Sequence, residues 1–418
     1  MTAAGGRSAS GSAPPLSRRA ALLLAAAGLV QLSPPRGRSA APVFSGPTAA
    51  ATVPAVRPEL EALLADRARA LLRHDAAALP AGEAGQAALR RLADLPLAEL
   101  SYRITEFTEP AGTGVTLTAE LGWRVAEYDE YPAVLRRRLS FERGTGGWRL
   151  TQEQPEGPAA PWDLGPVSVA PGRHCLVFGQ AAPAELARTA AAADQAVPLV
   201  GEVWGAGWPG KLLIGHPATT EQFDRLLGTP AGQYAGIAAV TTAAAGAPVR
   251  TPADRILINP QAYTGLSDLG RRVVTAHEIT HVATRADTKP WTPLWLSEGV
   301  ADHTGYRGTD RTPQQIAPEL AKAAAARGFS PKLPADADFT AGATGIALAY
   351  ELAWSACDLM VRRFGERRLV ALYRANAAAG PATTREEWLD GLLRTTLGLG
   401  LDEFTRLWAD DLHQRFAH

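Results

Sequence analysis

The chain has 418 residues, of which 46% are hydrophobic and 20% are charged. Its 42 basic and 42 acidic residues cancel to a formal net charge of zero. This length and composition predict two ordinary folded domains, and the neutral balance argues against a nucleic-acid-binding protein, which needs a basic face.

The N-terminal residues are typical of an export signal. Arg18 and Arg19 precede an apolar run over 20–32 that is too short for a comfortable membrane span. Ser39 and Ala41 occupy the small positions of a cleavage site. We therefore expect residues 1–41 to be removed on export, by the twin-arginine route if the arginine pair is its signal, with no stable membrane span afterwards. The alternative is an uncleaved anchor or an unfolded tail.

Residues 42–57 read as a Pro/Ala/Thr linker, and residues 58–155 as a small α+β domain. A helical leucine pattern over 58–79 is followed by segments that alternate apolar and polar residues and are broken by Gly or Pro. This order of elements and the ending "RLSFERGTGGWRLT" resemble the cone-shaped nuclear-transport-factor-2-like fold. Since no group of acids or histidines stands out here, a docking or spacer role is expected.

A second Pro/Gly-rich linker over 156–172 leads into the larger domain, residues 173–418. We expect strands at 174–178, 211–215, 235–242 and 254–259, helices at 183–196 and 220–228, and a mainly helical remainder. Cys175 and Cys357 either pair or remain buried free thiols. The stretch "GAGWPGKL" matches the skeleton of a phosphate-binding loop, but Leu212 stands where Ser or Thr would bind magnesium, so a turn is expected.

The stretch "HEITH" over 277–281 carries the first candidate ligands. Ser267 can cap a helix that starts at Asp268 and runs towards Arg285. His277 and His281 then stand one turn apart on one face and can converge on a tetrahedral cation. Glu278 lies about 100° round the helix, where it reaches a water on the metal but not the metal itself. The alternative is an ordinary helix whose histidines bond to backbone groups.

A second helix is predicted over 292–303, "TPLWLSEGVADH", with Thr292 as its cap and Pro293 in its first turn. Glu298 can supply the third zinc ligand, because such sites often take a carboxylate from a following helix. Asp302 shares its face and can accept the spare N–H of His277. Two carboxylates one turn apart repel each other on a surface, so a shared cation explains this pair better.

These residues resemble the gluzincin metallopeptidases, the class that includes thermolysin and the leukotriene-hydrolase-like aminopeptidases. The matching segments are "HEITH" and "WLSEG", and within the class the chain is most similar to bacterial exported peptidase MA-like proteins over 173–418. The resemblance implies a zincin-like fold, a zinc ion held by His277, His281 and Glu298, and Glu278 as general base. Sixteen residues separate His281 from Glu298, fewer than in the two named branches, and no G-x-M-E-N segment precedes the histidines. Exopeptidase activity is therefore not implied.

The resemblance also makes Tyr350, near the start of a helix over 348–365, the best match for the tyrosine that stabilises the oxyanion. The alternative is a buried aromatic residue that packs beside Trp354. His303 and Tyr306 are rivals for the same role because they lie closer in sequence to the zinc helix.

The sequence thus predicts an α+β protein with a zincin-like domain behind a small cone-like one. Its expected function is that of an exported zinc metallopeptidase acting on a peptide or protein, which would pair with an edge strand at 235–242 or 254–259. One alternative is a non-catalytic peptide- or cell-wall-binding protein on a zincin scaffold, although the intact Glu278 argues against it. Another is a zinc enzyme that hydrolyses a small amide or ester.

We predict that the exported protein lacks about its first 41 residues, because a charged segment followed by an apolar one directs cleavage. Intact-mass measurement of exported material checks this. A full-length mass would support an anchor instead.

Overall fold

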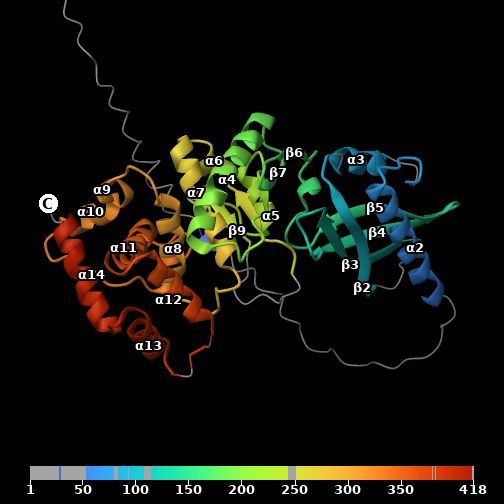
Figure 1. Ribbon diagram of the computed structural model, residues 1–418. Helices are drawn as coiled ribbons and strands as arrows, with labels where there is room; N and C mark the ends of the chain where they lie inside the picture. Colours follow the sequence, from blue (N-terminus) through green and yellow to red (C-terminus); the bar gives the residue numbers. More distant parts are fainter. Residues whose placement is uncertain are drawn as a thin grey trace, which may run out of the picture.

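The computed structural model describes residues 28–29, 53–79, 83–92, 94–107, 114–242, 251–378, 380–381 and 383–416. Apart from residues 28–29, the predicted export signal lies outside these ranges. The fold is α+β, as the sequence predicts. Figure 1 shows two sheets side by side, with helices α8 to α14 gathered at the end away from the four-stranded sheet. Within the described ranges, no helix combines the length and the apolar character needed to cross a membrane.

The N-terminal part is a four-stranded antiparallel sheet covered by helices. Its strands, in spatial order, are β2 (Leu97–Phe107), β3 (Gly114–Val125), β4 (Ala133–Gly144) and β5 (Gly147–Pro155). The helix predicted over 58–79 is α2 (Val53–Leu72), which begins inside the predicted linker and ends seven residues earlier than expected. Leu60 and Leu64 on it pack against Leu117 and Phe141 of the sheet. Helix α3 (Glu83–Leu92), which buries Leu89 and Leu92, was not predicted. The likeness to the nuclear-transport-factor-2-like fold stays a prediction.

The second sheet is mixed, in the order β1-β9-β10-β8-β7-β6. Its members are β6 (Ser168–Pro171), β7 (Cys175–Gly179), β8 (Leu212–Gly215), β9 (Ala239–Thr241), β10 (Arg255–Ile258) and β1 (Gly28–Leu29). Strands β7, β8 and β10 are parallel, whereas β9 runs antiparallel to β10 and β1 pairs in parallel with β9. Strand β6 lies in the predicted linker, and β1 lies inside the predicted export signal.

Helices cover both faces of this sheet. Helix α4 (Pro183–Trp204) continues through Pro198, beyond its predicted end at 196, and packs with α7 (Asp268–Thr284) on one face. Helix α5 (Thr220–Leu227) packs on the other face through Phe223 and Leu227, and α6 (Pro260–Tyr263) follows β10. The stretch that matches the skeleton of a phosphate-binding loop leads directly into strand β8, to which Leu212 belongs. It is therefore a turn before a strand, as predicted, and not a phosphate-binding loop. Cys175 and Cys357 are separate, buried free thiols, which excludes the disulfide.

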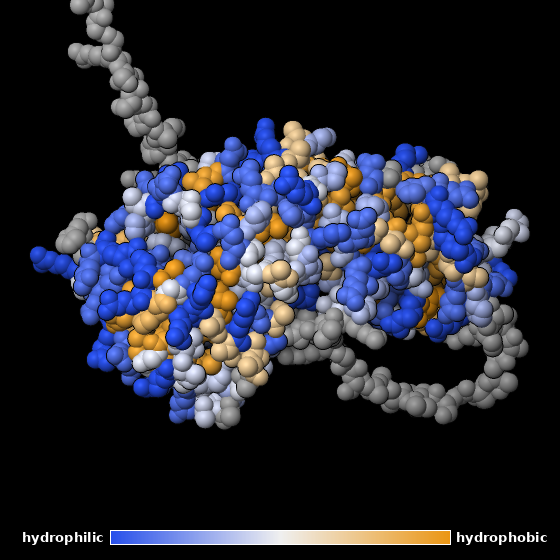
Figure 2. All heavy atoms as spheres, in the orientation of Figure 1, coloured by the Kyte–Doolittle hydropathy of each residue, from blue (hydrophilic) through white to orange (hydrophobic). Residues whose placement is uncertain are grey.

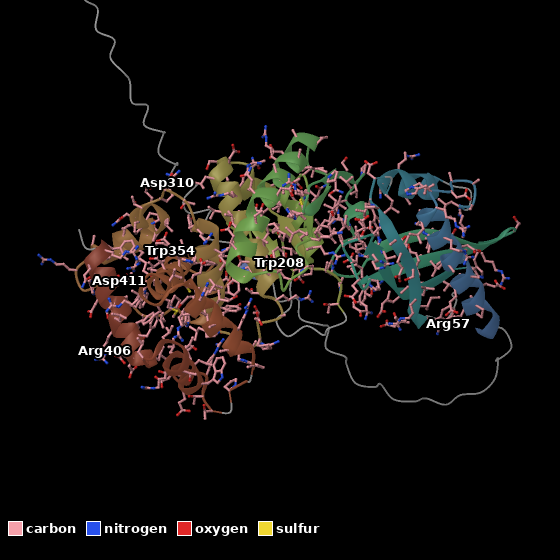
Figure 3. All side chains as sticks on the ribbon, in the orientation of Figure 1. Arg57, Trp208, Asp310, Trp354, Arg406 and Asp411 are labelled. Carbon is pink, nitrogen blue, oxygen red and sulfur yellow. The ribbon has the colours of Figure 1, made fainter. Side chains whose placement is uncertain are left out.

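The remaining helices pack through one large apolar core. They are α8 (Leu294–Tyr306), α9 (Pro313–Ile316), α10 (Pro318–Ala324), α11 (Ile346–Phe364), α12 (Glu366–Ala378), α13 (Arg385–Leu397) and α14 (Leu401–Phe416). Trp354 of α11 lies within this part (Figure 3). On the face shown in Figure 2, hydrophilic side chains predominate and hydrophobic ones are scattered among them.

The start of α8 differs from the sequence prediction. Pro293 precedes the helix as its N-cap, and the Thr292 hydroxyl instead accepts a hydrogen bond from the backbone N–H of Lys289. Asp336 accepts from the backbone N–H of Leu294 at 2.9 Å and so replaces the missing side-chain cap. The acid that satisfies the helix end is thus distant in sequence, where no local pattern reveals it.

Two glycines let α8 lie close to both of its neighbours. A Cβ at Gly299 would collide with the carbonyl oxygen of Ala353 and lie 2.7 Å from Sγ of Cys357, both on α11. A Cβ at Gly305 would lie 2.9 Å from the carbonyl oxygen of Val273 on α7. Gly299, the glycine of "WLSEG", therefore lets α8 pack closely against α11 directly after Glu298.

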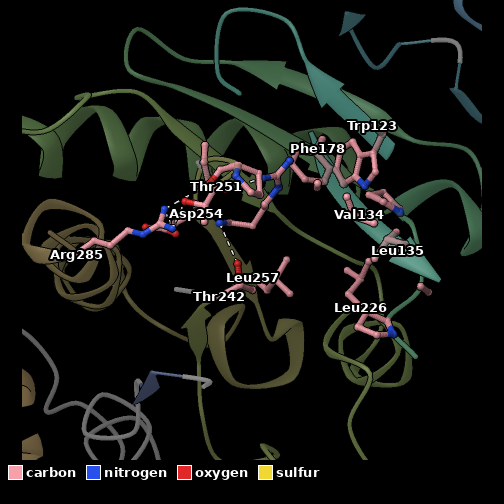
Figure 4. Close-up of a pocket in the computed structure, with 17 residues that line it drawn as sticks. Trp123, Val134, Leu135, Phe178, Leu226, Thr242, Thr251, Asp254, Leu257 and Arg285 are labelled. Carbon is pink, nitrogen blue, oxygen red and sulfur yellow. Dashed lines mark hydrogen bonds and ion pairs between the residues drawn. The ribbon is translucent and has the colours of Figure 1, made fainter. Parts of the chain in front are cut away.

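A cavity of about 300 Å³ is lined by residues of both sheets (Figure 4). Trp123, Val134 and Leu135 line one side, and Phe178 and Leu257 line the other. Beside it, Asp129 pairs with Arg255 at 2.7 Å, and Arg285, at the end of α7, pairs with Asp254 at 2.7 Å. Burial raises the pKa of Asp254 to about 6, against the effect of the two arginines. The pair of Asp129 and Arg255 therefore joins the N-terminal part to β10, the strand that leads into α6 and α7.

Replacing Gly299 by Ala should destabilise the protein by about 1–3 kcal/mol, because the added methyl group overlaps the backbone of α11. Urea unfolding measures the effect. Gly391→Ala, in the exposed middle of α13 where a Cβ meets no atom within 4 Å, is the matched control and should stabilise by roughly 0.5–1 kcal/mol. Equal effects in the two variants would contradict the proposed close packing.

Candidate metal centre

Helix α7 begins where the sequence predicts and carries the histidines into the core. The Ser267 hydroxyl accepts a hydrogen bond from the backbone N–H of Gly270 at 3.2 Å, and the helix runs from Asp268 to Thr284. His277, Glu278 and His281 are each at most 2% exposed. Ionisable groups at such depth require partners, because burial without them costs several kcal/mol.

Three ligand atoms from two helices meet at one point. Nε2 of His277 lies 3.0 Å from Nε2 of His281 and 3.2 Å from Oε2 of Glu298. The third side of the triangle, from Nε2 of His281 to Oε2 of Glu298, is 3.4 Å. Among the described residues, these three side chains form the group that could hold a metal ion.

The spacing and chemistry of the three atoms fit a bound cation. An ion bound tetrahedrally at about 2.0–2.2 Å keeps its ligand atoms roughly 3.3 Å apart, close to the sides of this triangle. Two imidazole nitrogens and one carboxylate oxygen also form a donor set that suits a borderline divalent metal.

Asp302 fixes the orientation of the first histidine. Its Oδ1 lies 2.8 Å from Nδ1 of His277, so that Nδ1–H donates to the carboxylate and Nε2 faces the other ligands. Burial alone would lower the pKa of His277, but the carboxylates of Asp302 and Glu298 outweigh it and raise that pKa well above its usual value. A metal ion must therefore compete with a proton for this histidine.

The acids at the site differ in their surroundings. Burial would raise the pKa of Glu298, but the two histidines lower it to about 2, so this carboxylate stays ionised.

Burial raises the pKa of Glu278, against the histidines and a hydrogen bond from Thr241. The Thr241 hydroxyl lies 2.6 Å from Oε2 of Glu278, whereas Oε1 is buried without a partner. Thr241 was not singled out in the sequence, since its contact with Glu278 depends on the tertiary fold.

Tyr350 lies beside the metal centre. Its ring centroid is 6.2 Å from that of His277 and 5.2 Å from that of Phe339, with which it forms an edge-to-face pair. Burial and the nearby carboxylates of Glu298, Asp302 and Glu278 raise the pKa of its hydroxyl, which stays protonated at neutral pH.

The rivals of Tyr350 have other neighbours. The ring centroid of Tyr306 lies 6.5 Å from that of Trp354, and burial together with the nearby Asp302 raises its pKa. Nε2 of His303 lies 3.8 Å from a carboxylate oxygen of Glu366.

Comparisons with known proteins are sparse. No protein-family model matches the chain, and no curated protein matches it. Among solved structures, a variant of the M1 zinc metallopeptidase of Deinococcus radiodurans, bound to a Tyr-Ser-Ala substrate, is similar at 13% identity and a TM-score of 0.33. The match covers 74% of this chain and 92% of that one. The likeness is too remote to transfer a function.

We predict that the metal-free protein binds about one zinc ion per chain and that its affinity falls, by up to about tenfold per pH unit, as the pH is lowered below the raised pKa of His277. The sign follows from the raised pKa of His277, because a proton held there must leave before the metal binds. Competition with a chromophoric chelator at several pH values measures it.

The double variant His277→Ala/His281→Ala is the control and should bind no zinc at the site. Stoichiometric zinc in that variant, or an affinity independent of pH, would contradict the assignment.

Proposed function

We propose that the protein is a zinc-dependent hydrolase that cleaves peptide bonds. The observation that carries this is the triangle of His277, His281 and Glu298 beside a buried carboxylate, Glu278, with one unpartnered oxygen. A purely structural zinc site is closed by four protein ligands, whereas a catalytic one keeps a position for water. Three ligands next to a free base favour the catalytic kind.

His277, His281 and Glu298 would hold the ion, and Asp302 would keep His277 in the tautomer that leaves Nε2 free to ligate. When bound, zinc supplies Lewis acidity, which makes a water nucleophilic and polarises the carbonyl under attack. Glu278 takes the proton of the attacking water on Oε1 and passes it to the leaving amine. Burial raises the pKa of Glu278, which makes the ionised carboxylate a stronger base toward the water proton.

Tyr350 would stabilise the oxyanion that forms on the scissile carbonyl. Its hydroxyl keeps its proton at neutral pH and therefore remains a hydrogen-bond donor.

We further propose that the substrate is an extended peptide or protein segment lying along β9. This short strand is antiparallel to β10 and contacts α7, the helix that carries Glu278. Its other edge pairs with Gly28–Leu29, which lie within the predicted export signal. Removal of that signal would free this edge for an added strand. Export through the signal in residues 1–41 remains part of the proposal, and the substrate would then be extracytoplasmic.

Glu278→Gln should reduce peptide cleavage by about 10²–10⁴-fold while zinc remains bound, because the amide has nearly the same shape but cannot take a proton. A peptide-library digest and zinc analysis on the same preparation measure the two effects.

Two further variants separate the proposed roles. Glu298→Gln should weaken zinc binding itself, and Tyr350→Phe should slow turnover with zinc content intact. Near-normal cleavage by Glu278→Gln would exclude the mechanism. A wild-type protein that binds peptides but cleaves none would favour the binding-module alternative.

A further inference from the structure

Thr241, the last residue of β9, contacts the proposed general base directly. Its hydroxyl lies 2.6 Å from Oε2 of Glu278 and 3.2 Å from the main-chain oxygen of the same residue. Both residues are fully buried. A hydroxyl has one hydrogen to donate, and the shorter contact, to a carboxylate oxygen, makes the stronger bond. Oε2 of Glu278 is thereby hydrogen-bonded to strand β9.

The second oxygen of Glu278 is in a different situation. Oε1 is buried and has no hydrogen-bond partner in the described part of the chain. Leaving such an atom unpaired is costly, so its isolation needs a reason. With Oε2 bonded to Thr241, Oε1 is the oxygen left to take a proton.

We propose that Thr241 is a positioning residue for catalysis: its hydroxyl holds Oε2 of Glu278 and so keeps Oε1 directed at the reacting water. The proposal rests on the hydrolase function proposed above. The terminal torsion of a glutamate is broad, so a carboxylate without such a bond samples many orientations. Proton transfer requires one of them, and its rate falls as the productive orientation becomes rarer.

The position of Thr241 in the sheet adds a second consequence. Its main chain is paired with Ile256 of β10 on one side and with Leu29 of β1 on the other. The residue that holds the base therefore belongs to the strand along which the peptide is proposed to lie. One hydrogen bond fixes the base relative to that strand, so its loss should lower kcat more than it changes KM.

A simpler role for the hydroxyl is to tie β9 to α7 through the main-chain oxygen of Glu278. Thr189 of α4, another fully buried threonine, provides a matched control for the loss of a buried hydroxyl. Its hydroxyl lies 3.0 Å from the main-chain oxygen of Glu185 and 3.0 Å from Nδ1 of His216. Thr189→Val removes a hydroxyl whose partners are a main-chain oxygen and a histidine outside the proposed site.

The first experiment compares steady-state kinetics and zinc content in the chain without residues 1–41, since Gly28–Leu29 otherwise pairs with β9. Thr241→Val should lower kcat by about 10- to 100-fold, the effect of losing one charge-assisted hydrogen bond, with KM and bound zinc nearly unchanged. Thr241→Ser should restore most of the activity, and Thr189→Val should behave like the wild type. An unchanged kcat in Thr241→Val, or an equal loss in Thr189→Val, would overturn the proposal.

The second experiment uses metal-free protein and needs no catalysis. Thr241→Val should lower the urea midpoint of the wild type but have a clearly smaller effect in a Glu278→Ala background, where the carboxylate is already absent. Equal shifts in both backgrounds would mean that the hydroxyl serves the main-chain oxygen, and would overturn the positioning role. If the wild type cleaves no peptide, the hydrolase function fails, and this cycle still decides whether Thr241 holds Glu278.

Discussion

The rest of the structure depends on how the negative charge of three buried carboxylates is compensated. Glu278, Glu298 and Asp302 share one space with two imidazoles, and burying unpaired charge there would cost more than a domain of this size can spare. Without a metal, His277 holds a proton more tightly because its pKa is raised, and that positive charge compensates part of the negative charge. A divalent cation in the ligand triangle would supply more of it while keeping both histidines neutral. The same charges that make the site costly to bury therefore favour metal binding.

The packing of α8 determines whether those charges meet. This helix carries Glu298 and Asp302, and its glycines at 299 and 305 let it approach α11 and α7 more closely than any side chain would allow. The result is that a ligand from α8 reaches the histidines of α7, while Tyr350 of α11 lies beside them. Strand β9 contributes from the sheet through Thr241. Four separate elements thus supply one site.

Local patterns were enough to predict many of these elements. The Ser267 cap and the pair of histidines one turn apart could be read from the local pattern, because a helix repeats every 3.6 residues. Glu298 was predicted as the third ligand because such sites often take a carboxylate from a following helix. Features that depend on tertiary contacts could not be predicted in this way. The helix predicted over 183–196 continues as α4 to Trp204, which contacts Thr304 of α8 and Tyr373 of α12. Asp336 caps α8 from outside the helix. The contact between Thr241 and Glu278 was likewise invisible, since a threonine in a strand predicts only the strand.

The central claim is that the three side chains hold a zinc ion. The most direct test is a crystal structure of protein purified without chelator, with diffraction data collected on both sides of the zinc absorption edge. The account predicts an anomalous peak about 2.0–2.2 Å from Nε2 of His277, Nε2 of His281 and a carboxylate oxygen of Glu298. A site without that peak, or a peak held by other residues while these three bond only to one another, would contradict it.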